Sequence, residues 1–377
     1  MTENKSLQIA SNEMLEIEAS TTKSDSSIRL YIFRALGITL MVLGHSGIYG
    51  RSIGVFTPFN FIYLFHMSLF FFYSGYFFRE VNLKTPWKFL KGKITTLYIP
   101  TIKYGIMFLV LRNLMIPLHL SNQAPIGSWS EFWNNGLDPI IRFYDTEQMM
   151  GAFWFLRVLF FANIIFWLLF RITHAVGRGR YKLLILGGLI LISSSAGFYM
   201  NIHEIWPPLN WIRELCILPI FFIGYLFGQY EKKIPMKWWI ALITLAWLMY
   251  CSISHCINIG SYIFVSPHFF LISSLAGIYG TMYLAHRLTR LPHRLSSTLA
   301  YIGKHSFDIL LWHFLAFKVV SYLRILWSDL PIDRLSMFPV LEGGGRYDFI
   351  AYTIIGVGLP LLLTAGLSRI VSLVRRI

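Results

Sequence analysis

The sequence predicts an all-α protein that forms a polytopic membrane helical bundle of about ten transmembrane helices. Its composition is the first reason: of 377 residues, 55% are hydrophobic, 17% aromatic and only 14% charged, with a mean hydropathy of +0.57. An ordinary soluble globule is less apolar. The second reason is a series of about ten apolar runs of spanning length. They cover residues 30–50, 59–78, 94–118, 153–170, 183–199, 212–230, 238–253, 268–286, 302–324 and 348–373.

The segment before the first run differs in composition. Residues 1–27 are rich in Ser, Thr, Glu and Asn, with too few bulky apolar side chains to form a core. We therefore expect a disordered cytoplasmic tail. The first apolar run lacks an A-x-A-like cleavage site and is interrupted by Arg34, which favours a retained signal-anchor helix. Residues 28–377 would then form one transmembrane domain.

The placement of basic residues predicts the orientation in the membrane. With a cytoplasmic N-terminus, the inside loops at 79–93, 171–182, 232–237 and 287–294 hold fifteen Lys and Arg residues. The outside loops hold four, Arg51, Arg142, Arg334 and Arg346. This bias follows the positive-inside rule, so both termini are predicted to be cytoplasmic. It also accounts for much of the net charge of +15 without a nucleic-acid partner.

The first run carries two ionisable side chains, Arg34 and His45. An isolated ionisable group in hydrocarbon is costly, so such residues usually face a protein interior or a cavity and mark a site. Eleven residues separate the two. On a helix they project from the same face, roughly 16 Å apart along the axis. One ligand could contact both side chains.

Later runs add further candidates. His66 lies about two turns from the outer end of the second run, as His45 does in the first, so the two could share a pocket. The remaining candidates each have a structural explanation as well. Trp154 can anchor the chain at the interface, and Asp308 can form an interhelical ion pair with Arg34. The others in or near the spans are Arg157, Arg213, Glu214 and His313.

Several common chemistries are not supported. The sequence has no G-x-x-x-x-G-K-[ST] run and no H-E-x-x-H, so neither a P-loop nor a zincin is predicted. The three cysteines lack metal-ligand spacing and are expected to be free thiols; we predict no metal site. The longest outside loop, about 119–152, can either contact a sugar or form an interfacial cap. It contains Trp129, Trp133, Asp138, Arg142, Asp145 and Glu147.

Five motifs in order resemble the membrane acyltransferase 3 family, and the fucose 4-O-acetylase-like branch is the most similar. The resemblance covers roughly residues 29–370. The motifs are Arg34 with His45 eleven residues on, Phe65-His66-Met67 with the Phe70–Tyr76 segment that contains Ser74, Tyr98-Ile99-Pro100 after a basic segment, Phe153-Trp154-Phe155-Leu156, and Gly303-Lys304-His305-Ser306 leading to Trp312-His313. The chain departs from the family pattern at Tyr31, where many members have an acid, at Lys91 and Lys93, where arginines are preferred, and near Leu310.

The resemblance implies a bacterial inner-membrane O-acyltransferase. It would move an acyl group, usually acetyl from acetyl-CoA as a co-substrate, to a hydroxyl of a surface polysaccharide or lipid-linked glycan. Arg34 would bind the donor, and His45 would act as general base or accept the acetyl group itself. Further donor contacts would come from Lys91, Lys93 and Asp308. Acceptor contacts would come from His66, Ser74, Trp154, Arg157, Arg213, Glu214 and His313.

Two other classes of protein remain open from the residues alone. A lipid-linked-sugar transporter or polymerase would also be a basic polytopic protein with buried charges. It would not require Arg34 and His45 on one helix face. A non-catalytic membrane scaffold would explain the aromatic content but not the intramembrane histidines. Release of free CoA from acetyl-CoA in the presence of a glycan acceptor would separate the transferase from both.

Overall fold

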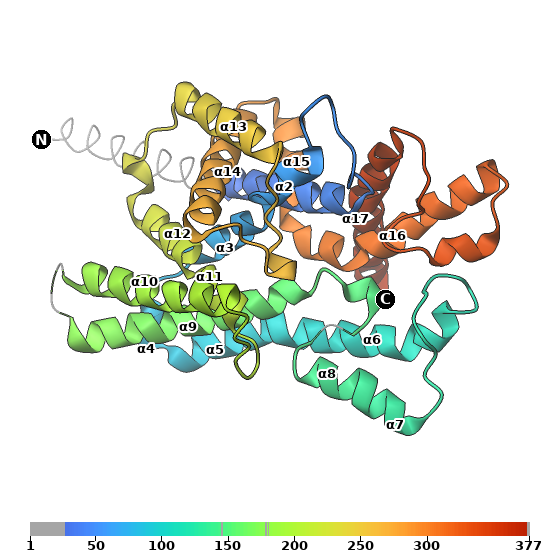
Figure 1. Cartoon of the computed structure of the whole chain (residues 1–377), viewed down its shortest axis with the longest axis horizontal. Helices are drawn as coiled ribbons and strands as arrows, with labels where there is room; N and C mark the ends of the chain where they lie inside the picture. Colours follow the sequence, from blue (N-terminus) through green and yellow to red (C-terminus); the bar gives the residue numbers. More distant parts are fainter. Residues whose placement is uncertain (1–26, 145, 178, 180, 375–377) are drawn as a thin grey trace, which may run out of the picture.

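The computed structural model describes residues 27–144, 146–177, 179 and 181–374. Across these residues the regular structure is helical, with two isolated β-bridges and no strand (Figure 1). The prediction of an all-α fold is confirmed. The tail predicted over residues 1–27 lies outside the described residues apart from Ser27, where the first helix begins.

Eight helices in the described ranges are long and apolar enough to cross a membrane. Each corresponds to one of the predicted apolar runs. They are the first helix (Ser27–His45), the continuous helix Pro86–Met115, α9 (Trp154–Val176), α10 (Tyr181–Ile202), the helix Ile212–Tyr230, α14 (Pro267–Leu288), α16 (Ser306–Trp327) and α17 (Asp348–Val374).

The other two predicted spans are helical but shorter. Run 59–78 forms α2 (Pro58–Tyr63) and α3 (His66–Tyr76), with a break at Leu64 and Phe65. The Phe65 ring packs directly on Gly277 of α14, where a Cβ atom would lie 2.0 Å from that ring. Run 238–253 forms α13 (Trp238–Ser252), whose 15 residues are few for a spanning helix. The predicted ten spans therefore correspond to eight long helices, the pair α2 and α3, and α13.

Short elements subdivide or connect the long helices. The helix Pro86–Met115 contains a π-helical segment, a feature that often occurs at functional sites. Its parts are α5 (Pro86–Lys93), η1 (Ile94–Tyr98) and α6 (Ile99–Met115). The helix Ile212–Tyr230 consists of α11 (Ile212–Cys216) and α12 (Leu218–Tyr230). The remaining elements are α4 (Val81–Lys84), α7 (Trp129–Glu131), η2 (Phe132–Leu137), α8 (Asp138–Ile141), η3 (Gln148–Met150), η4 (Glu231–Lys233), η5 (Ile259–Ser261), α15 (His293–Lys304) and η6 (Ile332–Ser336).

The helix α3 packs against α9, α12 and α14. Its backbone touches that of α12. A Cβ atom on Gly75 would lie 1.9 Å from the Phe221 carbonyl oxygen, and one on Gly224 would lie 2.2 Å from the Phe72 carbonyl oxygen. Small residues permit this close approach between membrane helices. The packing buries His66 of α3 and leaves Ser74 half-buried.

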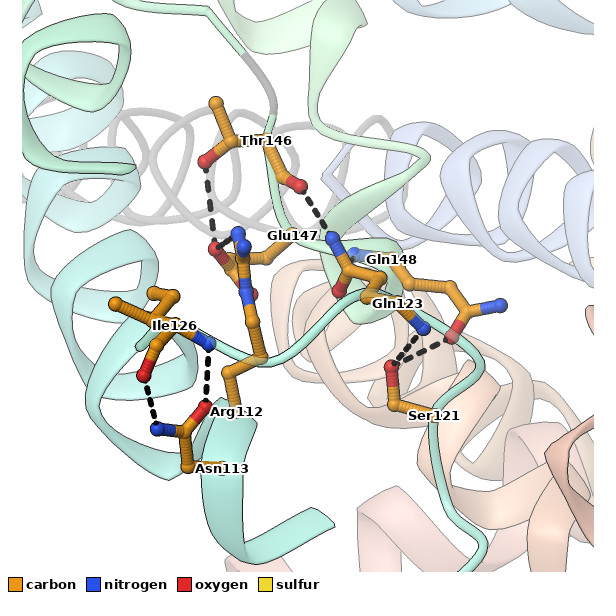
Figure 2. Close-up of polar contacts among 8 residues, drawn as sticks. All are labelled: Arg112, Asn113, Ser121, Gln123, Ile126, Thr146, Glu147 and Gln148. Carbon is orange, nitrogen blue, oxygen red and sulfur yellow. Dashed lines mark hydrogen bonds and ion pairs between the residues drawn. The ribbon is translucent and has the colours of Figure 1, made fainter. Parts of the chain in front are cut away.

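The long loop between α6 and α9 is held by polar contacts (Figure 2). Arg112 of α6 forms an ion pair with Glu147, and both side chains are buried. The Asn113 amide exchanges two hydrogen bonds with the backbone of Ile126, at 2.7 and 2.8 Å. Further hydrogen bonds in this network involve Ser121, Gln123, Thr146 and Gln148. The sequence predicts that this loop either contacts a sugar or forms an interfacial cap, and these internal contacts favour the cap.

Candidate active site

A cavity of about 1120 Å³ opens between the first helix, α3, η1 and α9. The first helix lines it with Arg34, Ile38, Met41 and His45. These residues are spaced four, three and four positions apart, which keeps their side chains on one helix face. As the spacing predicts, Arg34 and His45 reach the same space.

The Arg34 guanidinium is held without a carboxylate. It donates a hydrogen bond to the Ser306 hydroxyl and lies 5.0 Å from the centre of the Tyr73 ring. Within the described residues it takes part in no ion pair. The interhelical pair with Asp308 is therefore not formed. Asp308 instead pairs with His305, 2.9 Å from Oδ2 to Nδ1, and is not among the lining residues.

The cavity is basic at the end beyond Arg34. Lys88 and Lys93 line it there, together with the polar side chains of Thr85 and Thr96. Lys91, the other lysine predicted to contact the donor, is not among the lining residues. Two ammonium groups and the Arg34 guanidinium therefore face one space. Such a group of cations suits an anionic ligand.

Two imidazoles line the cavity near the end of the first helix. The His45 ring centre lies 5.2 Å from that of Phe314. His66 Nδ1–H donates to the Ile62 carbonyl oxygen at 2.9 Å, and the His66 ring centre lies 4.8 Å from that of Tyr63. Because a carbonyl oxygen only accepts, this bond places the His66 proton on Nδ1 and leaves Nε2 as an acceptor. The predicted sharing of one pocket by His45 and His66 is confirmed.

His313 lies beside His45 but away from the cavity. Its side chain is fully buried and is not among the lining residues. The two imidazole ring centres are 5.7 Å apart. The His313 Nδ1–H donates to the Leu310 carbonyl oxygen at 2.9 Å. This position does not support the predicted direct contact between His313 and a substrate.

The opposite wall of the cavity combines Trp154 with the loop formed by residues 257–261. Arg213 holds that loop. Its guanidinium donates to the Gly260 carbonyl oxygen at 3.2 Å and lies 5.3 Å from the centre of the Trp154 ring. Arg213 itself is not among the lining residues. The structure thus places Trp154 at the cavity surface and Arg213 behind it.

Three other predicted acceptor residues have different positions. Arg157 and Glu214 form a buried ion pair, 3.0 Å from Nη1 to Oε1, and Arg157 also donates to the Leu209 carbonyl. Neither is among the cavity-lining residues, so they contact each other in place of the predicted substrate. Ser74 does line the cavity, and its hydroxyl accepts a hydrogen bond from Asn163 Nδ2 at 3.0 Å.

Sequence reasoning missed parts of the cavity wall. Tyr63 and Tyr73 line it, as does the 257–261 loop. The chain has 20 tyrosines, and no spacing distinguishes these two. The loop is short and irregular, so hydrophobic periodicity gives no signal there.

The cysteines and the other potential metal ligands do not form a further site in the described residues. Cys216, Cys251 and Cys256 are all free, as their spacing predicts. Burial raises the pKa of Cys256 to about 11, so that thiol is protonated at neutral pH. Across the described ranges, no group of three His, Cys, Asp or Glu side chains is placed to hold a metal ion.

Comparison with known proteins identifies the family. A family model described as an acyltransferase domain matches residues 28–369. The match does not specify the fucose 4-O-acetylase-like branch. The comparisons with curated proteins and with solved structures returned no match. Because the family match covers most of the chain, including every residue that lines the cavity, the chain belongs to the acyltransferase 3 family of membrane acyltransferases.

Proposed function

We propose that this protein is an O-acetyltransferase that moves the acetyl group of acetyl-CoA to a hydroxyl of a cell-surface polysaccharide or lipid-linked glycan. The observation that carries the proposal is a single cavity with cations at one end and imidazoles further along. A donor such as acetyl-CoA needs cations to bind its phosphates and, further along the same cavity, an imidazole to act at its thioester. Acetyl-CoA would be a co-substrate in this reaction and would not stay bound between turnovers.

The basic end suits the donor. Arg34, Lys88 and Lys93 can donate charge-assisted hydrogen bonds to phosphate oxygens. The positive-inside rule assigns the basic segment 79–93, which contains α4 and α5, to the cytoplasm, where acetyl-CoA would enter. From Arg34 the donor arm would extend past Ile38 and Met41 to His45, a distance of roughly 16 Å along the helix. Lys91, outside the lining, would contribute long-range attraction.

The wall formed by Trp154 and the 257–261 loop suits the acceptor. An aromatic face can pack against the apolar face of a sugar ring. Asn258 and Ser261 offer polar groups on the same wall. The acceptor would approach from the outer face of a bacterial inner membrane, in which both termini of the chain are cytoplasmic. This arrangement brings donor and acceptor to His45 from opposite ends.

His45 is the proposed base. It would take the proton from the acceptor hydroxyl while the oxygen bonds to the thioester carbonyl carbon and the carbon–sulfur bond breaks. The departing CoA thiolate would then take that proton from the imidazolium. An acetyl-histidine route would instead place the acetyl group on His45 first. Trapping of radiolabelled acetyl on the protein without acceptor would distinguish that route.

A lipid-linked-sugar transporter or polymerase would also need a large intramembrane cavity. The family match favours the transferase. The first helix also favours the transferase. It places Arg34 and His45 about three helical turns apart on the face that lines the cavity, and a transport path does not require this arrangement.

The test uses membranes that contain the full chain. With acetyl-CoA and a glycan acceptor, we expect free CoA to appear together with acetylated glycan. His45→Gln retains hydrogen-bonding capacity but cannot accept a proton near neutral pH, so transfer should fall by roughly 10²–10⁴-fold at equal protein level. His174→Gln is the matched control, because His174 lies on α9 and bonds Glu80 outside this cavity. Near wild-type transfer by His45→Gln would place the base elsewhere.

A further inference from the structure

We propose that His313 is a positioning residue that accepts a hydrogen bond from the ring N–H of His45 and so holds His45 in the tautomer required of a base. The inference rests on the proposed function, because it assigns His313 a task only if His45 takes a proton. It also changes the role of His313 from substrate contact to support of another side chain.

The first observation is an unpartnered buried acceptor. His313 Nε2 is buried and has no hydrogen-bond partner among the described residues. The Nδ1–H of the same ring donates to the Leu310 carbonyl oxygen at 2.9 Å. Since a carbonyl only accepts, the ring proton is on Nδ1 and Nε2 carries a lone pair. Buried polar atoms are nearly always paired, so this lone pair is expected to have a partner in the reacting state.

The second observation is what surrounds that lone pair. The rings around His313 are those of Phe314, Phe317 and His45, with centres 4.0, 5.6 and 5.7 Å away. The phenyl rings have no hydrogen-bond donor, whereas an imidazole has one. Ring nitrogens lie on the rim of an imidazole, so a small movement of the His45 ring would bring its N–H to His313 Nε2. Catalytic hydrogen bonds often tighten in this way when substrate binds.

The third observation is the order of the two rings relative to the cavity. His45 lines the cavity, whereas His313 is fully buried and does not. A substrate in the cavity can therefore contact His45 but not His313. His66 differs from His313, because it lines the cavity and can contact substrate directly. His313 would therefore influence the reaction through His45.

This geometry defines what His313 does in the transfer step. One nitrogen of His45 faces the cavity with its lone pair and takes the acceptor proton. The other nitrogen of His45 keeps its hydrogen, which His313 Nε2 accepts. The acceptor oxygen bonds to the thioester carbon, the carbon–sulfur bond breaks, and the CoA thiolate takes the proton from His45. His313 gains and loses no proton; it orients His45 and stabilises the imidazolium, as the third member of a nucleophile–base arrangement does.

The experiment compares two substitutions in the full chain in membranes. His313→Leu removes the acceptor, whereas His313→Gln provides a side-chain oxygen in its place. We expect His313→Leu to lower kcat by about 10-fold or more, a part of the roughly 10²–10⁴-fold effect of a general base, with the KM for acetyl-CoA unchanged. His313→Gln should recover most of the lost kcat. Phe317→Leu, a packing change at another ring beside His313, should retain kcat near wild type.

Each outcome bears on one hypothesis. If the wild type transfers no acetyl group, the proposed function fails and His313 has no task. If the wild type is active and His313→Leu matches it, the positioning role is wrong. Equal losses in His313→Leu and His313→Gln would also overturn it, because glutamine keeps an acceptor. A loss in Phe317→Leu as large as in His313→Leu would assign the effect to packing.

Discussion

Arg34 differs from Arg112 and Arg157 in which groups contact its guanidinium. Arg112 and Arg157 each have a buried carboxylate, in Glu147 and Glu214, whereas Arg34 has a hydroxyl and an aromatic ring. Arg34 is half-buried, and a cation withdrawn from water without a counterion is unfavourable. The position of the Arg34 guanidinium becomes favourable once an anion binds beside it. Arg34 is therefore evidence for a donor site, because it is a cation whose counterion would come with the ligand.

Substitution of Arg34 should weaken use of the donor. Loss of a hydrogen bond to a charged group is worth about 1.5–3 kcal/mol, which predicts that Arg34→Ala raises the KM for acetyl-CoA by roughly 10- to 100-fold. Arg34→Lys should recover only part of this, because a point charge replaces a planar fork. Asp308→Ala is the control and should leave that KM unchanged, since Asp308 pairs with His305. Recovery of activity in the Arg34→Ala, Asp308→Ala double variant would instead indicate that the two side chains are coupled.

Substitution in the Arg157–Glu214 pair should change stability more than chemistry. Both groups are buried, so Arg157→Ala would leave an uncompensated carboxylate at a cost of about 3–5 kcal/mol. We expect little Arg157→Ala protein in the membrane on quantitative blotting. The double variant Arg157→Met, Glu214→Leu removes both charges and should accumulate better than the single variant. A single variant present at wild-type level with high acceptor KM would show that Arg157 contacts substrate after all.

At the scale of elements, the contact between α3 and α12 supports the site. Gly75 on α3 and Gly224 on α12 allow the two backbones to touch, and α3 carries His66 and Ser74 to the cavity. At the break between α2 and α3, the Phe65 ring likewise occupies the space that Gly277 leaves open. Close contacts at glycine therefore position one wall of the cavity.

Enlargement of Gly224 should separate these helices. A Cβ atom there would lie 2.2 Å from the Phe72 carbonyl oxygen, and backbone cannot yield as a flexible side chain does. Gly224→Leu should lower the amount of folded protein recovered in mild detergent and the thermal midpoint of what remains. Gly188→Leu on α10 is the matched control, since no atom lies within 4 Å of the added Cβ atom. Equal stability of the two variants would contradict the importance of this contact.

At the scale of the whole molecule, the cavity is lined by two segments that the basic-residue bias assigns to opposite sides of the membrane. Lys88 and Lys93 line one end, and the 257–261 loop lines the other. A donor from the cytoplasm and an acceptor from outside could then meet without either one crossing the membrane completely. This arrangement depends on the orientation of the chain.

The orientation is testable by cysteine labelling. In a variant without the three native cysteines, a cysteine at Lys88 should react with a membrane-impermeant maleimide only after the cells are permeabilised. A cysteine at Ser261, an exposed residue of the loop lining the other end, should react in intact cells. Labelling at position 88 in intact cells would overturn the proposed topology and, with it, cytoplasmic entry of the donor.

The sequence by itself determined the fold class, eight of the spans and the facing of Arg34 and His45 toward one space. These properties follow from composition and from helical periodicity, which depend on residues close together in the chain. The two remaining spans, one formed by α2 with α3 and the other by α13, were harder to predict. The Phe65 ring at the break packs on Gly277, more than 200 positions away along the chain, and no local pattern shows such a contact.

Only the tertiary structure decided which polar residues meet. It paired Arg157 with Glu214 and Asp308 with His305, placed His313 behind His45, and brought Tyr63 and the 257–261 loop to the cavity. The physical reason is that a polar side chain in a bundle must find a partner, and several arrangements satisfy the same sequence. Which partner it finds depends on the rotation and depth of each helix, and these are determined by side-chain packing across the whole bundle.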